Sequence, residues 1–158
     1  MAGFGTPDLN TVDAAGLKLG IAVTRWHGDL TSQMLDRAEA AAKACGVDDV
    51  RIAYVAGSVE LSVIAQALAR QCDAVVALGV VIRGGTAHFE YVCQSVTDGL
   101  TRVALDESTP VAHGVLTVDT LEQARDRAGY ADSAEDKGWG AVVAALDAAL
   151  AVRAVRGF

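Results

Sequence analysis

The sequence predicts a single α/β domain in three layers, with a parallel sheet between two layers of helices. Short apolar segments alternate four times with segments of helical periodicity, and one more helical segment follows. The apolar segment 74–82 is apolar at nearly every position, so both of its faces should be buried, as in parallel sheets. This order of elements is typical of an open sheet with right-handed crossovers. The length of 158 residues suits one domain.

The first half of the chain is expected to begin with a strand, a helix and a second strand. Residues 17–25 (LKLGIAVTR) and 50–56 (VRIAYVA) are short and rich in branched apolar side chains, which favours strands. Between them, apolar residues follow helical spacing from residue 28 to residue 45. Gly46 then stands where a helix C-cap is expected.

The middle of the chain is expected to contain two further helices around the buried strand 74–82. The first covers residues 58–70, and Ser58 is its expected N-cap because serine hydroxyls accept hydrogen bonds from helix N–H groups. The second runs from Thr86 to Val103, where apolar residues again recur with helical spacing.

The end of the domain is expected to hold a fourth strand and two helices. Residues 111–118 (VAHGVLTV) form the strand. A helix follows over residues 119–129, with Asp119 or Thr120 near its cap, and the last helix covers residues 135–152.

Residues 1–16 contain Gly, Pro and Asp and match no core element. We therefore expect them to be either disordered or an arm that pairs with a neighbouring molecule, and the domain itself to cover residues 17–158. The N-terminal stretch also lacks the basic and apolar regions of a signal peptide, and no apolar run reaches the roughly 20 residues that span a bilayer.

Composition and charge exclude several classes of partner. The net charge of −7 argues against binding to nucleic acid or to an anionic membrane surface. The three cysteines form no CxxC pair and no Cys/His pattern with zinc-finger spacing, so no metal site is expected. Widely spaced free thiols are typical of a reducing, cytoplasmic location. We expect all three to be buried free thiols: Cys45, Cys72 and Cys93.

Residues suited to ligand binding follow three of the expected strands. Ligands of open parallel sheets bind beyond the carboxyl ends of the strands. The sequence places an aromatic pair, Trp26-His27, a helix start with a carboxylate, residues 57–60, and the loop 83–88 (RGGTAH) there. Glycines let a backbone approach a ligand, helix N-termini favour anions, and His88 exchanges protons near neutral pH.

Each of these features also has a purely structural explanation. RGGT is equally typical of a tight turn, Trp26 of a packing residue, and Arg83 of an ion-pair partner. Glu60 suits the first turn of a helix because of the helix dipole. Three loops that bring complementary groups to one edge nevertheless indicate a site for a flat polar ligand beside an anion.

Four segments resemble the 6,7-dimethyl-8-ribityllumazine synthase family. They are AGSVELS (56–62), IRGGTAHFEYVC (82–93), GVLTVDTLEQARDRAG (114–129) and EDKGWG (135–140). WHGDL (26–30) is similar to the actinobacterial branch in particular, and the resemblance extends from about residue 17 to residue 150.

The resemblance implies a flavodoxin-like four-stranded sheet whose N-terminal arm adds a strand to an adjacent subunit. It implies homo-oligomers, pentamers or icosahedral assemblies of pentamers, with the active site between subunits. The implied transferase reaction condenses 5-amino-6-(D-ribitylamino)uracil with 3,4-dihydroxy-2-butanone 4-phosphate to 6,7-dimethyl-8-ribityllumazine. Phosphate and water are released in this penultimate step of riboflavin biosynthesis, and no cofactor or metal takes part.

The resemblance also implies roles for individual residues. His88 would shuttle protons, Arg127 of a neighbouring subunit would bind phosphate, and Lys137 would assist electrostatically. The implied substrate-binding residues are Trp26, Ser58, Val59, Glu60, Val80, Val81, Ile82, Gly84, Gly85, Thr86, His113 and Arg127. The chain departs from the family pattern at Ala87, where proline is usual, and at His113, where many members have Phe or Asn.

Two alternative functions are compatible with the same fold. An archaeal-type riboflavin synthase would dismutate lumazine and would need no phosphate site. A non-catalytic shell that binds or stores ribityl-flavins would need neither a proton shuttle nor a phosphate anchor. The presence of His88 and Arg127 favours the lumazine synthase.

Overall fold

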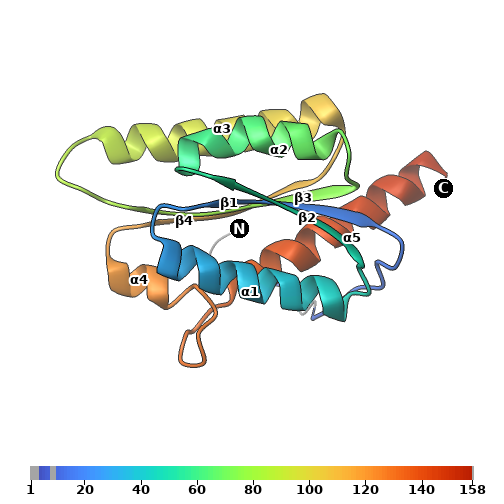
Figure 1. Cartoon of the computed structure of the whole chain (residues 1–158), viewed down its shortest axis with the longest axis horizontal. Coiled ribbons are helices and arrows are strands. Elements are labelled where there is room, and N and C mark those ends of the chain that lie inside the picture. Colours follow the sequence, from blue (N-terminus) through green and yellow to red (C-terminus); the bar gives the residue numbers. More distant parts are fainter. Residues whose placement is uncertain (1–3, 8–9, 158) are drawn as a thin grey trace.

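A four-stranded parallel sheet forms the centre of the protein in the computed structural model, which describes residues 4–7 and 10–157 (Figure 1). Its order is β2-β1-β3-β4, and every neighbouring pair is parallel. The predicted three-layer fold is confirmed, and no strand end differs from its predicted position by more than one residue. The strands are β1 (Lys18–Thr24), β2 (Asp49–Val55), β3 (Ala74–Ile82) and β4 (Val111–Val118).

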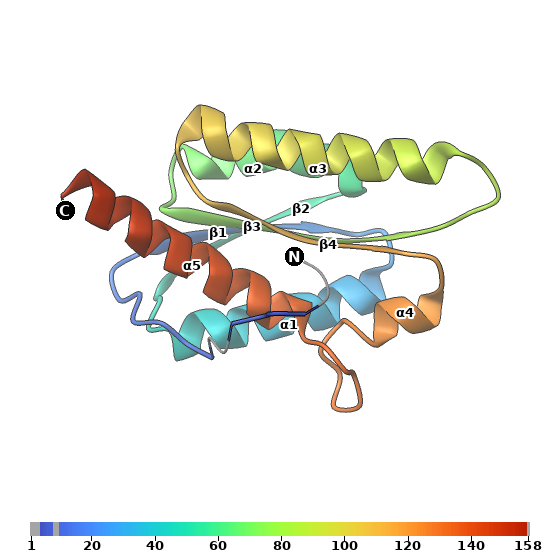
Figure 2. The same cartoon turned by 180° about the vertical axis from the view of Figure 1, so that it is seen from behind.

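Helices cover both faces of this sheet (Figures 1 and 2). A short 3₁₀ helix, η1 (Ser58–Glu60), precedes α2 (Leu61–Ala69), which lies with α3 (His88–Glu107) on one face. The other face carries α1 (Gly28–Ala44), α4 (Leu121–Arg125) and α5 (Lys137–Arg156). The crossovers therefore bury most of the central strand β3 on both faces, as the continuous apolar pattern of residues 74–82 predicted.

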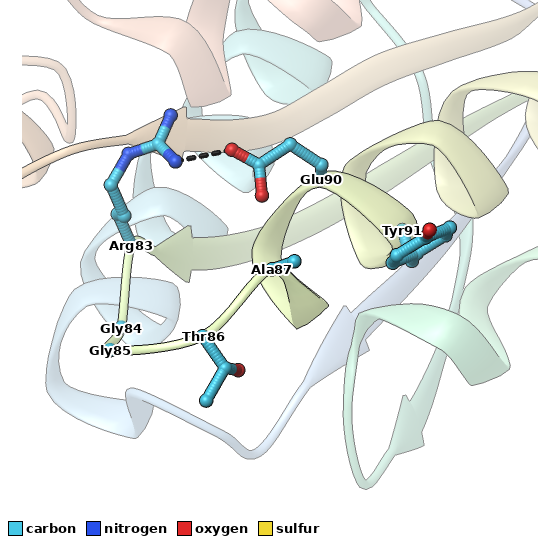
Figure 3. A pocket seen from close by; sticks show the side chains of 7 residues that line it. All are labelled: Arg83, Gly84, Gly85, Thr86, Ala87, Glu90 and Tyr91. Carbon is cyan, nitrogen blue, oxygen red and sulfur yellow. Dashed lines mark hydrogen bonds and ion pairs between the residues drawn. The ribbon is translucent and has the colours of Figure 1, made fainter.

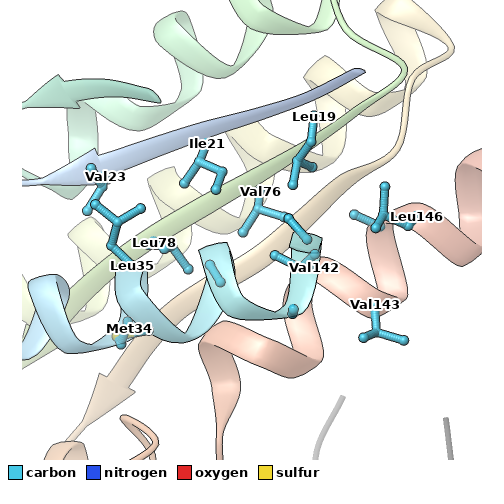
Figure 4. Packing of buried hydrophobic residues seen from close by; sticks show 14 of the residues in the cluster. Leu19, Ile21, Val23, Met34, Leu35, Val76, Leu78, Val142, Val143 and Leu146 are labelled. Atoms are coloured by element: carbon cyan, nitrogen blue, oxygen red, sulfur yellow. The ribbon is translucent and has the colours of Figure 1, made fainter. Parts of the chain in front are cut away.

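Alternating side chains of the central strands divide the core into two clusters. Leu19, Ile21 and Val76 point toward α1 and α5 (Figure 4), and all three are fully buried. Their neighbours Ala22 and Val75 belong to the cluster on the side of α2 and α3. Because successive residues of a strand face opposite sides, both clusters rest on the same two strands and hold their carboxyl ends in place.

The start of the second helix differs from its prediction. Ser58 makes no capping hydrogen bond, and the carboxylate of Glu60 instead accepts a hydrogen bond from the N–H of Gly57 (3.1 Å). Ser58 is buried, and its hydroxyl lies against the backbone of Gly79 in β3. The predicted capping role of Ser58 is therefore wrong, because the side chain packs into the sheet.

The segment after β4 is also less helical than the spacing predicted. α4 ends at Arg125, and residues 126–136 form a loop before α5. Thr120 is the N-cap of α4, and its hydroxyl accepts a hydrogen bond from the N–H of Gln123 (3.1 Å). Gly129, which was expected to close this helix, lies three residues beyond the C-cap residue Asp126 and adopts a φ of +83°, a conformation that other residues rarely adopt, within the loop.

The helix α5 is long and apolar enough to cross a membrane when judged by length and composition alone, with a mean hydropathy of 1.5 over its most apolar window. We expected no segment long and apolar enough to span a bilayer, and α5 does not meet this expectation. Core helices pass the same test, and the face with Val142, Val143 and Leu146 is buried against the sheet (Figure 4). These contacts make α5 a core helix of this domain.

Residues 10–16 are attached to their own chain. The indole N–H of Trp139 in α5 donates a hydrogen bond to the carbonyl of Asn10 (2.9 Å), and the N–H of Ala14 donates one to the carbonyl of Cys45 (2.9 Å). Ala14 is fully buried in the core. The expectation that residues 1–16 fit no core element is wrong for this part, because a small side chain fits there; residues 1–3 and 8–9 lie outside the described chain.

The cysteines follow their prediction for the most part. Cys45 and Cys72 are buried and free, and burial raises the pKa of the Cys72 thiol. Cys93 is free but only half-buried, because it lies on the partly exposed first half of α3.

Candidate active site

The carboxyl edge of the sheet is where the chain can hold a ligand. In the order β2-β1-β3-β4, the connections from β1 and β3 lead to opposite sides of the sheet. Such a switch point leaves a crevice between the two strand ends, and ligands of open α/β sheets bind there. Trp26 follows β1, and Ile82 ends β3, so both lie beside this point.

Strand β3 extends beyond the end of its pairing with β1. The last β1–β3 pair is Val23 with Leu78, whereas β3 stays paired with β4 as far as Ile82 with Val118. Within the described chain, the backbone groups of residues 80–82 that face β1 therefore have no strand partner. Backbone N–H and C=O groups are strong hydrogen-bonding groups, so this edge offers donors and acceptors to a heterocycle.

Trp26 presents an aromatic face beside this edge. Its backbone N–H donates to the carbonyl of Ala56 (3.0 Å), which ties the loop after β1 to the loop after β2. The ring lies next to Gly57, where a Cβ atom would be 3.5 Å from Cε3 of Trp26. The side chain is 68% exposed, so the ring is available for stacking rather than packed into the core.

Ser58, Val59 and Glu60 continue the same edge in η1. Gly79 leaves room for the side chain of Ser58, because a Cβ atom at residue 79 would lie only 2.8 Å from the serine Oγ. Val59 is half exposed. Glu60 stabilises the turn by accepting the hydrogen bond from the N–H of Gly57, a structural role other than the helix-dipole contact that the sequence suggested.

The loop that follows β3 borders an open pocket of about 570 Å³ (Figure 3). A Cβ atom at Gly84 or Gly85 would meet nothing within 4 Å, so the backbone faces open space there. The hydroxyl of Thr86 accepts a hydrogen bond from the N–H of His88 (3.3 Å), and His88 is the exposed first residue of α3. The residues that line the pocket are Arg83, Gly84, Gly85, Thr86, Ala87, Glu90 and Tyr91.

Arg83 is occupied by ion pairs within its own chain. Its Nη1 donates to the Glu90 carboxylate (Figure 3). Its Nε donates to Oδ1 of Asp119 (2.7 Å), and its guanidinium lies 4.4 Å from the centre of the Phe89 ring. Hydrogen bonds to the two carboxylates raise the pKa of Arg83, and the bond from Arg83 holds the pKa of Glu90 below its usual range. Of the two explanations open for Arg83, the ion pair is the one observed.

Arg127 and Lys137 lie on the other side of the sheet from α3, at the ends of the loop between α4 and α5. Nη1 of Arg127 donates to the carbonyl of Gln123 (2.9 Å). Nε of Arg127 and Nζ of Lys137 are each 3.6 Å from the same oxygen, Oε2 of Glu135. The structure therefore brings Arg127 and Lys137 together, in a cluster separate from His88.

His113 forms a third location. It lies opposite Ala77 in the register of β3 and β4, five positions before Val118, or about 16 Å along the strand from the carboxyl edge. Its Nε2 is 3.0 Å from the hydroxyl of Thr97 in α3. Partial desolvation lowers the pKa of His113, which favours the neutral ring. Within one chain, His113 is thus remote from Trp26 and His88.

A family model described as 6,7-dimethyl-8-ribityllumazine synthase matches residues 16–153 of this chain. The chain belongs to this family. Proteins named 6,7-dimethyl-8-ribityllumazine synthase are 72% identical in Salinispora arenicola (153 residues, 97% of this chain and 92% of the relative) and 61% identical in Saccharopolyspora erythraea (158 residues, 100% and 96%). The relative of that name in Thermobifida fusca is also 61% identical, over 99% of this chain and 91% of its own.

Membership of the lumazine synthase family confirms the resemblance seen in the sequence. Sequence reasoning missed three residues that shape the site: Gly79, Glu90 and Asp119. The signal for Gly79 was present, because an isolated glycine inside an apolar strand often marks a close approach of another group. No local pattern pointed to Glu90 and Asp119 as the partners of Arg83, since that contact depends on the packing of α3 against β4.

Proposed function

We propose that this chain condenses 5-amino-6-(D-ribitylamino)uracil with 3,4-dihydroxy-2-butanone 4-phosphate to 6,7-dimethyl-8-ribityllumazine. This transferase reaction is the penultimate step of riboflavin biosynthesis. The match of the lumazine synthase family over residues 16–153 carries the proposal. The site residues named by the resemblance are all present, and most of them lie at the carboxyl edge of the sheet.

The pyrimidine substrate binds at the edge between β1 and β3. Trp26 stacks on the flat ring with its exposed face. Backbone groups of Val80, Val81 and Ile82 that lack a strand partner form hydrogen bonds with the ring edge. Ser58, Val59 and Glu60 contact the ribityl chain from η1.

His88 acts as the proton shuttle beside the glycine loop. It takes a proton from the 5-amino group of the pyrimidine as nitrogen attacks the ketone carbon, and gives it to the oxygen that leaves as water. The resulting imine loses the proton of its hydroxyl-bearing carbon as phosphate leaves the next carbon, which gives an enol. The enol becomes a ketone, the ribitylamino nitrogen attacks this ketone, and loss of a second water closes the lumazine ring. Gly84, Gly85 and Thr86 line the pocket, and their backbone N–H groups stabilise the phosphate, as glycine loops before helices do.

A neighbouring copy of the chain completes the site. In one chain, His88 and the pair formed by Arg127 and Lys137 lie on opposite sides of the sheet, so the two groups meet only when subunits associate. We propose a homo-oligomer, a pentamer or an icosahedral assembly of pentamers, in which Arg127 binds the phosphate and Lys137 assists electrostatically. The arm would add a strand to the adjacent sheet, and His113 would approach the pyrimidine from the neighbour.

The proposed location is the cytoplasm, and the proposed reaction uses neither a cofactor nor a metal. Among the described residues, no three His, Cys, Asp or Glu side chains gather where they could hold a metal ion. The proposed partners are the two small-molecule substrates, without nucleic acid or membrane.

The test is to mix the purified protein with both substrates and to follow lumazine absorbance and released phosphate together. The proposal predicts that the two products appear one-to-one, well above the uncatalysed rate. Tight binding of a flavin without any acceleration would instead support a storage shell. Conversion of lumazine to riboflavin without phosphate release would support a riboflavin synthase.

A further inference from the structure

Glu135 places a carboxylate between the two cations that the proposed function assigns to phosphate binding. One oxygen, Oε2, is 3.6 Å from Nε of Arg127 and 3.6 Å from Nζ of Lys137. We propose that Glu135 is a built-in competitor of the phosphate group. It occupies the cation pair while no anion is bound and leaves when phosphate binds, and the competition keeps phosphate binding weak enough for rapid release of the product. This inference rests on the proposed roles of Arg127 and Lys137.

The geometry of the two contacts favours replacement of the Glu135 carboxylate by a phosphate group. Charge-assisted hydrogen bonds between nitrogen and oxygen are usually about 2.7–2.9 Å long, so contacts of 3.6 Å are attractions between charges rather than strong hydrogen bonds. Within their own chain all three side chains are about 40–50% exposed, so burial in the subunit does not lock them into the pair. A phosphate oxygen can therefore replace the Glu135 carboxylate at small cost.

The backbone of this loop stays in place when the Glu135 side chain turns away. The N–H of Glu135 donates to the carbonyl of Asp126 (2.9 Å), and its carbonyl accepts a hydrogen bond from the N–H of Gly129 (3.2 Å). The next residue, Asp136, forms an ion pair with Arg37 (2.8 Å) and caps α5. Only rotation of one side chain is needed, and the two cations remain where they are.

The charges of the cluster support an anion as the incoming group. Two cations share one carboxylate, which leaves a surplus of one positive charge even before Glu135 moves away. Arg127 is also anchored by its bond to the carbonyl of Gln123, so it cannot follow the carboxylate into solvent. A dianionic phosphate neutralises both cations, which one carboxylate does not.

The substitution Glu135→Gln tests the competition because it removes the charge and keeps the shape. The control Glu122→Gln removes the same charge from an exposed position on α4, where no ion pair is observed in the described chain. Titration calorimetry with inorganic phosphate compares the variants without turnover. The same ion is then used as a competitive inhibitor against the butanone phosphate.

We expect Glu135→Gln to bind inorganic phosphate about three-fold to ten-fold more tightly, the range for loss of one or two exposed ion pairs. The inhibition constant of phosphate and the KM of the butanone phosphate fall by the same factor, while the KM of the pyrimidine stays constant. Glu135→Asp retains the charge and keeps phosphate binding close to that of the unaltered protein, and so does Glu122→Gln.

Unchanged or weaker phosphate binding in Glu135→Gln would overturn the inference, because Glu135 would then orient the cations instead of competing for them. Failure of the proposed function would give a different experimental result. The unaltered protein would then form no lumazine, whereas calorimetry would still report whether loss of the Glu135 charge tightens phosphate binding.

Discussion

Two clusters of charged side chains in this protein contain carboxylates and cations in opposite proportions. In the glycine loop, residues 83–90 with Asp119, one arginine faces two carboxylates, and the Arg83–Asp119 contact is 2.7 Å long. In the cluster at the α4–α5 loop (residues 126–136), the carboxylate of Glu135 faces two cations, Arg127 and Lys137, at 3.6 Å. The first set of contacts is short and more than neutralises the charge of its cation, whereas the second set is long and leaves one positive charge without a carboxylate partner.

The difference indicates how each loop contributes to the site. Two carboxylates already neutralise the charge of Arg83, so its guanidinium attracts a phosphate only weakly, and its bond to Glu90 instead holds the first turn of α3, which carries His88. At the α4–α5 loop, by contrast, Arg127 and Lys137 can bind an incoming anion. In the RGGT segment, the groups proposed to bind phosphate are therefore backbone N–H groups. The charged side chains proposed to bind it, Arg127 and Lys137, belong to the cluster at the α4–α5 loop.

The largest effect is expected from the substitution His88→Ala in the glycine loop. Loss of one general acid–base slows turnover by about 10²-fold to 10⁴-fold. Binding of the pyrimidine, measured by titration, changes little because Trp26 and β3 remain. A variant with unaltered kcat would show that protons move through another group.

Arg127→Ala is expected to have the next largest effect, and on a different parameter. Hydrogen bonds to charged groups are worth about 1.5–3 kcal/mol, so the KM of the butanone phosphate should rise about ten-fold to hundred-fold. Steady-state kinetics with each substrate varied in turn measures the change. The control Arg125→Ala removes the same charge nearby, from a side chain that stacks on Tyr130, and should leave this KM alone.

Gly129→Ala tests whether the shape of the α4–α5 loop depends on its glycine. Alanine at a φ of +83° is strained, and its Cβ would lie 2.8 Å from Cγ of Arg37, so we expect a loss of about 1–3 kcal/mol of stability. Urea unfolding measures this loss. The matched change Gly140→Ala lies in α5 with no neighbour within 4 Å, and should be neutral or stabilising because alanine favours helices.

The smallest effect is expected from Arg83→Met. The hydrogen bond from Arg83 lowers the pKa of Glu90 in the folded protein, so this pair adds stability above the unfolded carboxyl pKa and loses it as pH falls through the folded pKa. In the variant, the pKa of Glu90 rises toward its ordinary value, and the stability of the protein depends less on pH in the acid range. An NMR titration of Glu90 measures the shift, and Arg102→Met, which breaks the Arg102–Asp106 pair in α3, is the control.

The sequence predicted the layers, the strands and the residues at the carboxyl edge because these depend on local periodicity and on short motifs. It did not predict contacts between distant segments. Ser58 is a residue type that often caps helices, but its side chain packs against the sheet because Gly79 has no side chain to exclude it. The sharing of Glu135 by Arg127 and Lys137 depends on the path of the loop after Gly129, for which periodicity gives no signal.

The two tryptophans of this chain occupy contrasting surroundings, and this makes the protein its own optical reporter. Trp26 is largely exposed at the substrate edge, whereas Trp139 is partly buried and bonded to Asn10. Trp26 should therefore emit at longer wavelength and be quenched by iodide or by a stacked heterocycle. Trp139 should emit at shorter wavelength and respond when the segment around Asn10 detaches, so one fluorescence spectrum separates ligand arrival from arm release.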